Sequence, residues 1–238
     1  MKSLFFIVLF LVSILSFSQD LKLGIVVTPH ISWLSSEDRI SEREGVRVGF
    51  GFGMAGNYYF SEHYAFSFGI NLNNFTGGKL RYTEAVKFEA DDSVFDMDPK
   101  TEVLYKLQYL EIPLGFKLNT NKIGYFSYFG QFGFAPGFIL NARGKSTNSY
   151  FENVKINNEV AMFNLPYFIG AGAEYYLGGS EKSSAITFGV IYKKGINDLT
   201  KTDTDRKSDK VLLNNVVLQL GLIRSEEHTS ELQSPNTI

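Results

Sequence analysis

The chain has 238 residues, a formal net charge of −2, 22 glycines, 22 phenylalanines, 13 tyrosines and no cysteine. The charge excludes a polybasic surface for nucleic acid, and the lack of cysteine excludes disulfides, thiol catalysis and thiolate metal sites. Glycine and aromatic residues together favour a sheet over a helical bundle. A mean hydropathy of −0.05 excludes a helical membrane protein but is compatible with a membrane barrel, whose strands are apolar only at alternate residues.

Residues 1–18 have the pattern of a secretory signal peptide. Lys2 supplies the positive charge, residues 4–15 form the apolar region, and the small residues Ser16 and Ser18 precede a cleavage site before Gln19. The apolar run is short for a membrane span, and no cysteine follows the cut to carry a lipid anchor. We therefore expect export across the inner membrane and a mature chain that begins at Gln19.

The rest of the chain alternates between large apolar and small or polar residues. Eight stretches show this period of two: 21–33, 46–60, 64–76, 103–118, 123–140, 162–177, 185–196 and 211–223. The second, VRVGFGFGMAGNYYF, is typical: even positions are large and apolar except for Gly56, and odd positions are mostly glycine or polar. The pattern predicts strands with one bulky apolar face and one small or polar face.

The connections between these stretches alternate in length. Short ones (61–63, 119–122, 178–184) separate long ones (34–45, 77–102, 141–161, 197–210). Outer-membrane barrels have short periplasmic turns and longer external loops, and a sheet in lipid must close on itself to pair its backbone groups. We therefore predict an all-β fold, an eight-stranded antiparallel transmembrane β-barrel over residues 19–223. The alternative, a soluble sandwich that buries the bulky face, explains the strands but not the alternating loop lengths.

Charged residues on the small-residue face are predicted to point into the lumen. They form a proposed lumen charge network of Arg47, Glu111, Lys117, Glu174 and Lys193. A buried charge must be paired or hydrogen-bonded, and eight strands enclose only enough space for side chains. We interpret the network as a structural plug in preference to a conducting path.

Residues 109–117, YLEIPLGFK, resemble the signature of the PorT-like outer-membrane β-barrel proteins. The resemblance covers most of residues 19–223 and implies an outer-membrane barrel, but it marks a family and not an activity. The namesake of that family is linked to a protein-secretion system, which implies an accessory role as an alternative function. The apolar alternation changes phase near Tyr109 and Leu110, which predicts a bulge in this strand.

Residues 224–238, RSEEHTSELQSPNTI, break abruptly from the apolar pattern before them and resemble a translated sequencing adapter. We expect this segment to be a non-native tail; a natural polar tail is the alternative. Residues after Ile223 are therefore excluded from functional reasoning.

Two histidines are candidates for catalysis. His30 is predicted to point inward and could act as a general base beside Ser32, although a lone inward histidine is more often a hydrogen-bonded filler. His63 lies in a predicted short turn, where a solvated side chain is expected. No nucleophile elbow, HExxH motif or paired-carboxylate arrangement accompanies them, so we do not expect an enzyme and predict no cofactor.

The long connection 77–102 is acidic. It carries a candidate cation site made of Glu89, Asp91, Asp92, Asp96 and Asp98. Carboxylates at this density can bind Ca²⁺, but the segment lacks the glycine and the spacing of a calcium loop. A solvated acidic loop is the favoured interpretation.

Together these features predict a monomeric barrel in the outer membrane of a two-membrane bacterium, with its long loops external and both termini periplasmic. Its expected partners are outer-membrane lipid and envelope proteins, not nucleic acid. The favoured function is non-enzymatic, structural or surface-interacting through the loops. The alternatives are an accessory of outer-membrane transport or secretion and, third, a membrane-embedded hydrolase.

Overall fold

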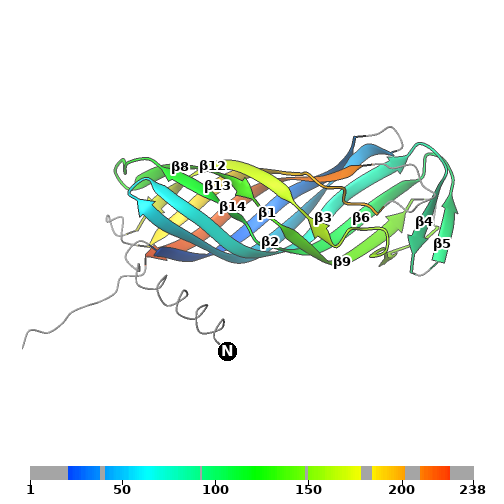
Figure 1. Cartoon of the computed structure of the whole chain (residues 1–238), viewed down its shortest axis with the longest axis horizontal. Helices are drawn as coiled ribbons and strands as arrows, with labels where there is room; N and C mark the ends of the chain where they lie inside the picture. The colour runs from blue at the N-terminus through cyan, green and yellow to red at the C-terminus, as the bar shows by residue number, and fades with distance from the viewer. Residues whose placement is uncertain are drawn as a thin grey trace, which may run out of the picture.

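The computed structural model is an elongated barrel of antiparallel strands (Figure 1). It describes residues 21–37, 41–91, 93–147, 150–177, 184–201 and 210–225. The predicted signal peptide, Asp92 and all but the first two residues of the proposed tail lie outside these ranges. Within them, the search for a helix long and apolar enough to span a membrane finds none.

The strands follow the chain without an intervening helix in the described residues. They are β1 (Leu21–Ser36), β2 (Ser41–Ser61), β3 (Tyr64–Tyr82), β4 (Val86–Ala90), β5 (Ser93–Met97), β6 (Glu102–Glu111), β7 (Leu114–Asn119), β8 (Phe126–Phe134), β9 (Gly137–Ser146), β10 (Val154–Lys155), β11 (Phe163–Asn164), β12 (Pro166–Tyr176), β13 (Ala185–Gly195) and β14 (Val211–Ser225). Two predicted strands are each divided in two, β6–β7 at Pro113 and β8–β9 at Pro136, because proline cannot donate a hydrogen bond to the ladder.

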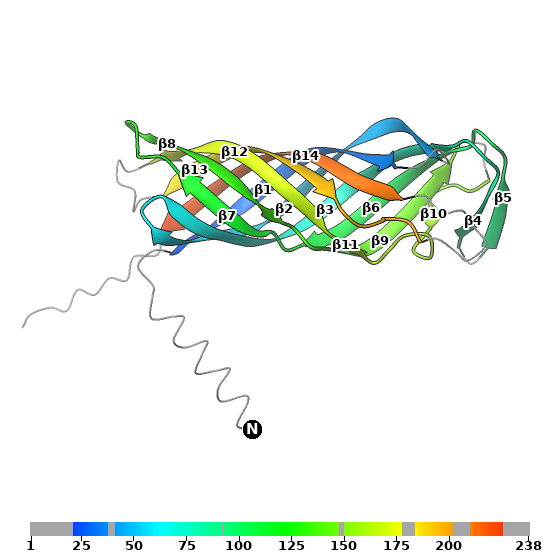
Figure 2. The same cartoon turned by 45° about the horizontal axis from the view of Figure 1, so that its top comes forward.

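All of these strands except β4 and β5 form one closed ring. The order is β10-β9-β6-β3-β2-β1-β14-β13-β12-β8-β7, and an additional β3–β7 pairing closes it. Figure 2 shows β7 and β8 beside β12 at the end where the short connections lie. We call this the turn end, and the opposite end, which carries β4 and β5, the loop end. The all-β antiparallel ring confirms the predicted fold class.

The outer face of the ring carries the large apolar side chains. In β2, Phe50, Phe52 and Met54 are 48%, 51% and 56% exposed, whereas Gly49 and Gly51 on the opposite face of the strand are buried. The glycines are needed because a Cβ on Gly51 would lie 2.4 Å from the Asn73 and Thr28 side chains. The predicted alternation of a bulky outer face with a small inner face is therefore confirmed.

Towards the loop end the hydrophobic pattern inverts. The predicted strand 64–76 continues as β3 to Tyr82, after a bulge at Phe75, which has a positive φ of 57°. Beyond the bulge Leu80 and Tyr82 are buried, whereas the outward Lys79 is only half-buried. Here the wall is polar outside and apolar inside, as in a water-soluble protein.

A register shift lies next to the bulge predicted around Tyr109 and Leu110, between Gln108 and Tyr109 in the β6–β9 ladder, but the extra residue is not in β6 itself. Burial alternates without interruption along β6, and the extra residues lie in its neighbours, at Phe75 in β3 and Leu140 in β9. The apolar phase changes in β6 because the strand passes from the apolar interior of the loop end to the polar interior of the part of the ring whose outer face is apolar, which we call the membrane zone after its predicted location. The backbone itself keeps one phase.

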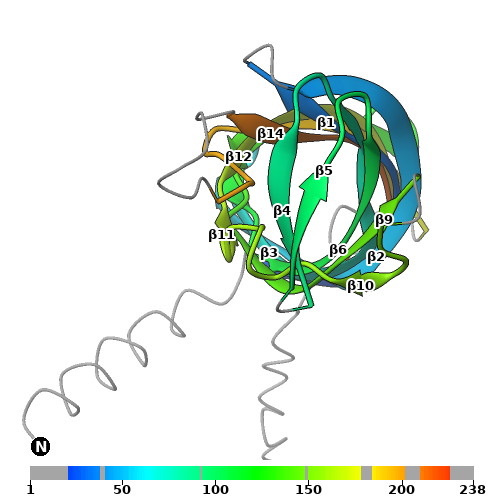
Figure 3. The same ribbon diagram turned by 90° about the vertical axis from the view of Figure 1, so that its right-hand side faces the viewer.

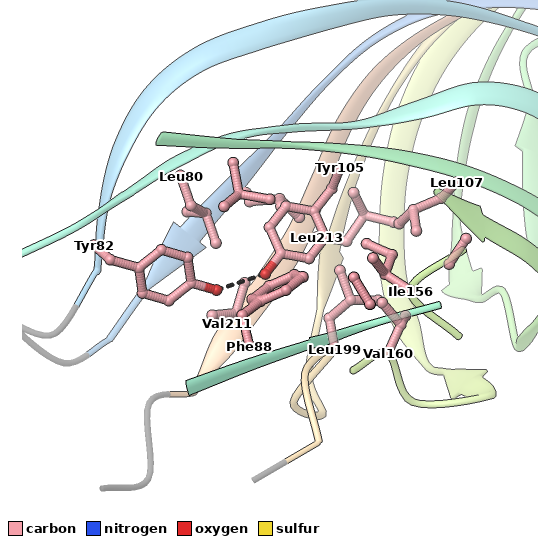
Figure 4. Close-up of a cluster of buried hydrophobic side chains, with 14 of the residues drawn as sticks. Leu80, Tyr82, Phe88, Tyr105, Leu107, Ile156, Val160, Leu199, Val211 and Leu213 are labelled. Atoms are coloured by element: carbon pink, nitrogen blue, oxygen red, sulfur yellow. Dashed lines mark hydrogen bonds between the residues drawn. The ribbon is translucent and has the colours of Figure 1, made fainter. Parts of the chain in front are cut away.

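An apolar cluster, here called the cap core, fills the loop end. It comprises Leu34, Leu80, Tyr82, Val86, Phe88, Ala90, Met97, Val103, Tyr105, Leu107, Tyr109, Ala142, Phe151, Ile156, Val160, Leu199, Val211 and Leu213. The β4–β5 hairpin crosses the mouth of the ring (Figure 3). Its Phe88 is fully buried among core side chains that include Tyr82 and Tyr105 (Figure 4). The segment predicted as a long open loop is thus a folded lid.

Candidate functional site

An ion pair is buried inside the ring near the turn end. Lys117 of β7 bonds Glu174 of β12, and the two side chains are only 3% and 0% exposed. The Tyr176 hydroxyl donates to Glu174 Oε2 at 2.9 Å, and Lys117 Nζ lies 4.1 Å from the centre of the Phe129 ring. Both charges are therefore satisfied inside the barrel, as buried charges must be.

A second ion pair lies further towards the loop end. Lys193 of β13 bonds Glu111 of β6, and their side chains are 7% and 0% exposed. Beside Lys193 lies a cavity of about 40 Å³ whose polar lining includes Thr28, Asn71 and Gln131. Because such a volume can hold water and these groups can bond to it, the cavity suits water and not a larger ligand.

Arg47 does not join either ion pair. Its Nε donates to the Phe75 carbonyl at 2.7 Å, and the side chain is half-buried. The β2–β3 ladder is interrupted here, between the pairs Gly45↔Lys79 and Phe50↔Asn74, so this carbonyl can accept a side-chain donor. The structure brings four of the five predicted network residues together as two pairs and places the fifth at the bulge.

His30 and Ser32 both point inward but do not bond to each other. His30 Nε2 is 2.9 Å from Thr76 Oγ1, and its Nδ1 is 3.0 Å from the Thr28 carbonyl. If Nδ1 carries the proton and donates to that carbonyl, Nε2 accepts from the threonine hydroxyl. Ser32 Oγ instead accepts from the Gly77 backbone N–H at 2.9 Å. Neither side chain is arranged as half of a nucleophile–base pair.

The other candidates lie at the two ends of the barrel. At the turn end His63 Nε2 is 2.6 Å from Asn121 Oδ1. At the loop end, Glu89 accepts from Asn158 at 2.7 Å and Asp98 accepts from the Tyr150 hydroxyl at 2.6 Å. No three His, Cys, Asp or Glu side chains gather to hold a metal in the described part of the chain, which omits Asp92.

The cap core is the feature that sequence reasoning missed. Its signal was present in residues 103–109, where Val103, Tyr105, Leu107 and Tyr109 alternate with more polar residues. This is the same alternation as in the membrane zone but with the apolar side chains pointing inward. A period of two shows that a strand has two faces, but it does not show which face meets lipid.

Comparison with solved structures finds several chains that resemble this one at low sequence identity. Neisserial surface protein A is 10% identical, with a TM-score of 0.46 over 87% of this chain and 97% of its own. The attachment invasion locus protein Ail of Yersinia pestis is 14% identical, with a TM-score of 0.40 over 86% and 99%. The outer membrane protease OmpT of Escherichia coli is 8% identical, with a TM-score of 0.42 over 88% and 97%. Likenesses this distant carry no weight for function.

Comparisons of the sequence with curated proteins and with family models give different results. No curated protein matches the chain. A family model described as outer membrane protein beta-barrel domain matches residues 17–201, which is more than half of the sequence. The match agrees with the closed antiparallel ring, its apolar outer face and its polar lumen. The chain therefore belongs to the outer membrane protein β-barrel domain family.

Proposed function

We propose that this outer-membrane protein is a non-conducting, non-enzymatic barrel that presents its folded loop end outside the cell as an interaction surface. The observation that carries the proposal is the cap core. A barrel that transports solute needs an open lumen, whereas here the β4–β5 hairpin packs Phe88 and Met97 into the mouth of the ring. The packed cap makes the exposed loop-end residues a rigid surface.

The interior supports a closed barrel as well. The Lys117–Glu174 pair links β7 to β12 past the intervening β8, the Lys193–Glu111 pair links β13 to β6, and all four side chains are at most 7% exposed. Separating such a pair leaves an uncompensated buried charge, which costs about 3–5 kcal/mol. Opening a path along the axis would require both pairs and the cap core to give way.

A non-enzymatic role is supported by the hydrogen bonds of His30. Both ring nitrogens are engaged by Thr28 and Thr76, and the side chain is only 4% exposed. This histidine stabilises the wall below the cap core. For a hydrolase we would expect a histidine at a solvent-accessible site beside a nucleophile.

The PorT-like resemblance supports a second candidate, an accessory of outer-membrane secretion. The resemblance rests on the motif at residues 109–117, and it implies that the chain belongs to the PorT-like proteins within the wider family. In the structure, however, Glu111 of this motif pairs with Lys193, and the Pro113 carbonyl accepts from the Gly69 N–H at 3.1 Å. These contacts maintain the barrel, so they explain the motif without a secretion partner.

Cysteine labelling tests the orientation on which the surface role depends. The native chain has no cysteine, so a single introduced cysteine gives a single labelling site. The two variants are Val94→Cys on β5 and Tyr125→Cys at the turn end, where the native side chains are 66% and 56% exposed. A membrane-impermeant maleimide should label intact cells only at position 94. Labelling only at position 125 would place the cap in the periplasm and refute the proposal.

A conductance measurement tests the closed lumen. The purified protein in a planar bilayer should give no steady single-channel current. A reproducible open current from the native protein would refute a non-conducting barrel. Photocrosslinking from position 94 in intact membranes then separates the two candidates: a stoichiometric complex with one envelope protein favours the accessory, and its absence favours the surface role.

A further inference from the structure

We propose that a row of three cations on the outer wall binds the phosphate groups of membrane lipids. The cation row consists of Lys106 on β6, Arg143 on β9 and Lys155 on β10. Lys106 is paired with Arg143, and Arg143 is paired with Lys155, across neighbouring strands. Their inward neighbours, such as Tyr105 and Ala142, are buried in the cap core, so the three cations point outward.

The arrangement is unfavourable for an isolated protein. Residues directly opposite each other on adjacent strands have Cβ atoms about 4.5–5.5 Å apart, and like charges there are destabilising. Lys106 Nζ donates to Asn153 Oδ1 at 3.1 Å, a neutral acceptor. Among the described residues, the side chains of Arg143 and Lys155 have neither a hydrogen bond nor an acidic partner. An anion bridging the row would remove the repulsion.

Neighbouring charges do not neutralise the row. Two acids lie near the row: the carboxylate of Glu152 is already bound by Lys145 at 2.6 Å, and Asp91, whose backbone N–H donates to the Lys155 carbonyl at 2.9 Å, forms no ion pair with the row. The hydrogen bond from Lys145 lowers the pKa of Glu152, with a smaller electrostatic contribution from Lys106. By contrast, Lys79 on β3 is paired with Glu102 at 3.1 Å. The β6–β9–β10 part of the wall therefore carries a local excess of positive charge that the wall at Lys79 does not.

The height of the row matches the position of lipid phosphates. Below it on β9 come Leu140 and Phe138, which are 55% and 43% exposed and belong to the apolar outer face. Arg143 lies three residues beyond Leu140, which is about 10 Å along the strand at 3.4 Å per residue. Strand tilt shortens this distance along the membrane normal, so the cations lie at the level of the headgroups, just outside the hydrocarbon.

Position and charge together favour lipid over a soluble anion. Basic residues beside a membrane attract anionic lipids, and each Lys or Arg contributes about 1 kcal/mol, which is about fivefold in affinity. Three adjacent cations can bind the phosphate of a lipid whose acyl chains lie against the apolar outer face of the barrel. The inference depends on insertion of the barrel into a membrane and on its apolar outer face. It does not depend on which side of the membrane the cap core occupies.

Native mass spectrometry of the detergent-solubilised protein tests the proposal. Phosphatidylglycerol should bind more tightly than phosphatidylcholine, by about fivefold or more. The variant Lys106→Gln/Arg143→Gln/Lys155→Gln should lose this preference. A charge-matched control, Lys100→Gln/Lys194→Gln/Lys201→Gln, removes three cations outside the row and should keep it.

Three results would overturn the proposal. They are equal binding of the two lipids by the native protein, an undiminished preference in the row variant, and equal loss in the control. Inorganic phosphate in solution distinguishes the source of the anion: if it displaces phosphatidylglycerol at equal concentration, the row binds free phosphate and not a lipid. Heat-modifiable migration on a gel verifies that each variant forms a closed barrel.

Discussion

Replacing Phe88 with alanine should open the β4–β5 lid without unfolding the barrel. Phe88 on β4 is fully buried, and its ring centre lies 5.1 Å from that of Phe151, 6.3 Å from that of Tyr105 and 6.4 Å from that of Tyr82. Truncating a buried phenylalanine costs about 3–5 kcal/mol. Most of this loss falls on the hairpin, because β4 pairs only with β5 and not with the wall.

Hydrogen exchange in lipid nanodiscs measures the effect where it is expected. If local opening governs exchange, a loss of 3 kcal/mol accelerates exchange of the hairpin amides by about a hundredfold. The amides of β12 and β13 should exchange as in the native protein, because the aromatic rings that Phe88 contacts belong to other segments. The unboiled protein should still migrate faster than the boiled one.

Val94→Ala on β5 is the matched control. Val94 belongs to the same hairpin but is 66% exposed, so its truncation removes little buried area and should change exchange by less than about threefold. Equal acceleration by both variants would mean that the hairpin is held by its backbone and not by the cap core. Fast exchange of the hairpin in the native protein would refute the closed lid.

Three further predictions concern the wall and the lumen. Glu174→Gln leaves the Lys117 charge buried and should cost about 3–5 kcal/mol in urea unfolding, whereas the double variant with Lys117→Met should recover most of this loss. Gly53→Val should abolish the heat-modifiable barrel, because a Cβ would lie 2.1 Å from a backbone oxygen, whereas Gly130→Ala should be tolerated, since nothing lies within 4 Å. The hydrogen bond from Arg81 lowers the pKa of Glu102 below its ordinary 4.5. This bond stabilises the folded protein above pH 4.5, and the stabilisation is lost as the pH falls through the lower pKa of the folded state. Acid should therefore loosen the loop end less in Glu102→Gln than in the native protein.

The sequence by itself determined the closed antiparallel barrel and its outward apolar face. Alternation in residues such as Phe50, Phe52 and Met54 is a local property, and a backbone in lipid has few ways to pair all its polar groups. The sequence also placed Glu111, Lys117, Glu174 and Lys193 on the inner face. It could not pair them, because a partner is chosen by strand register and tilt across the lumen.

Only the tertiary structure decided what happens at the loop end. A period of two looks the same whether the apolar residues face lipid or a protein core. The change of phase at Tyr109 and Leu110 therefore looked like a bulge in this strand, whereas it marks the level at which the interior of the ring changes from apolar to polar. Phe88 could lie in a solvated loop or fill the mouth of the ring. The outcome depends on its contacts with Tyr105 and Phe151, which are distant from it in the sequence. Such contacts exist only once the ring has closed.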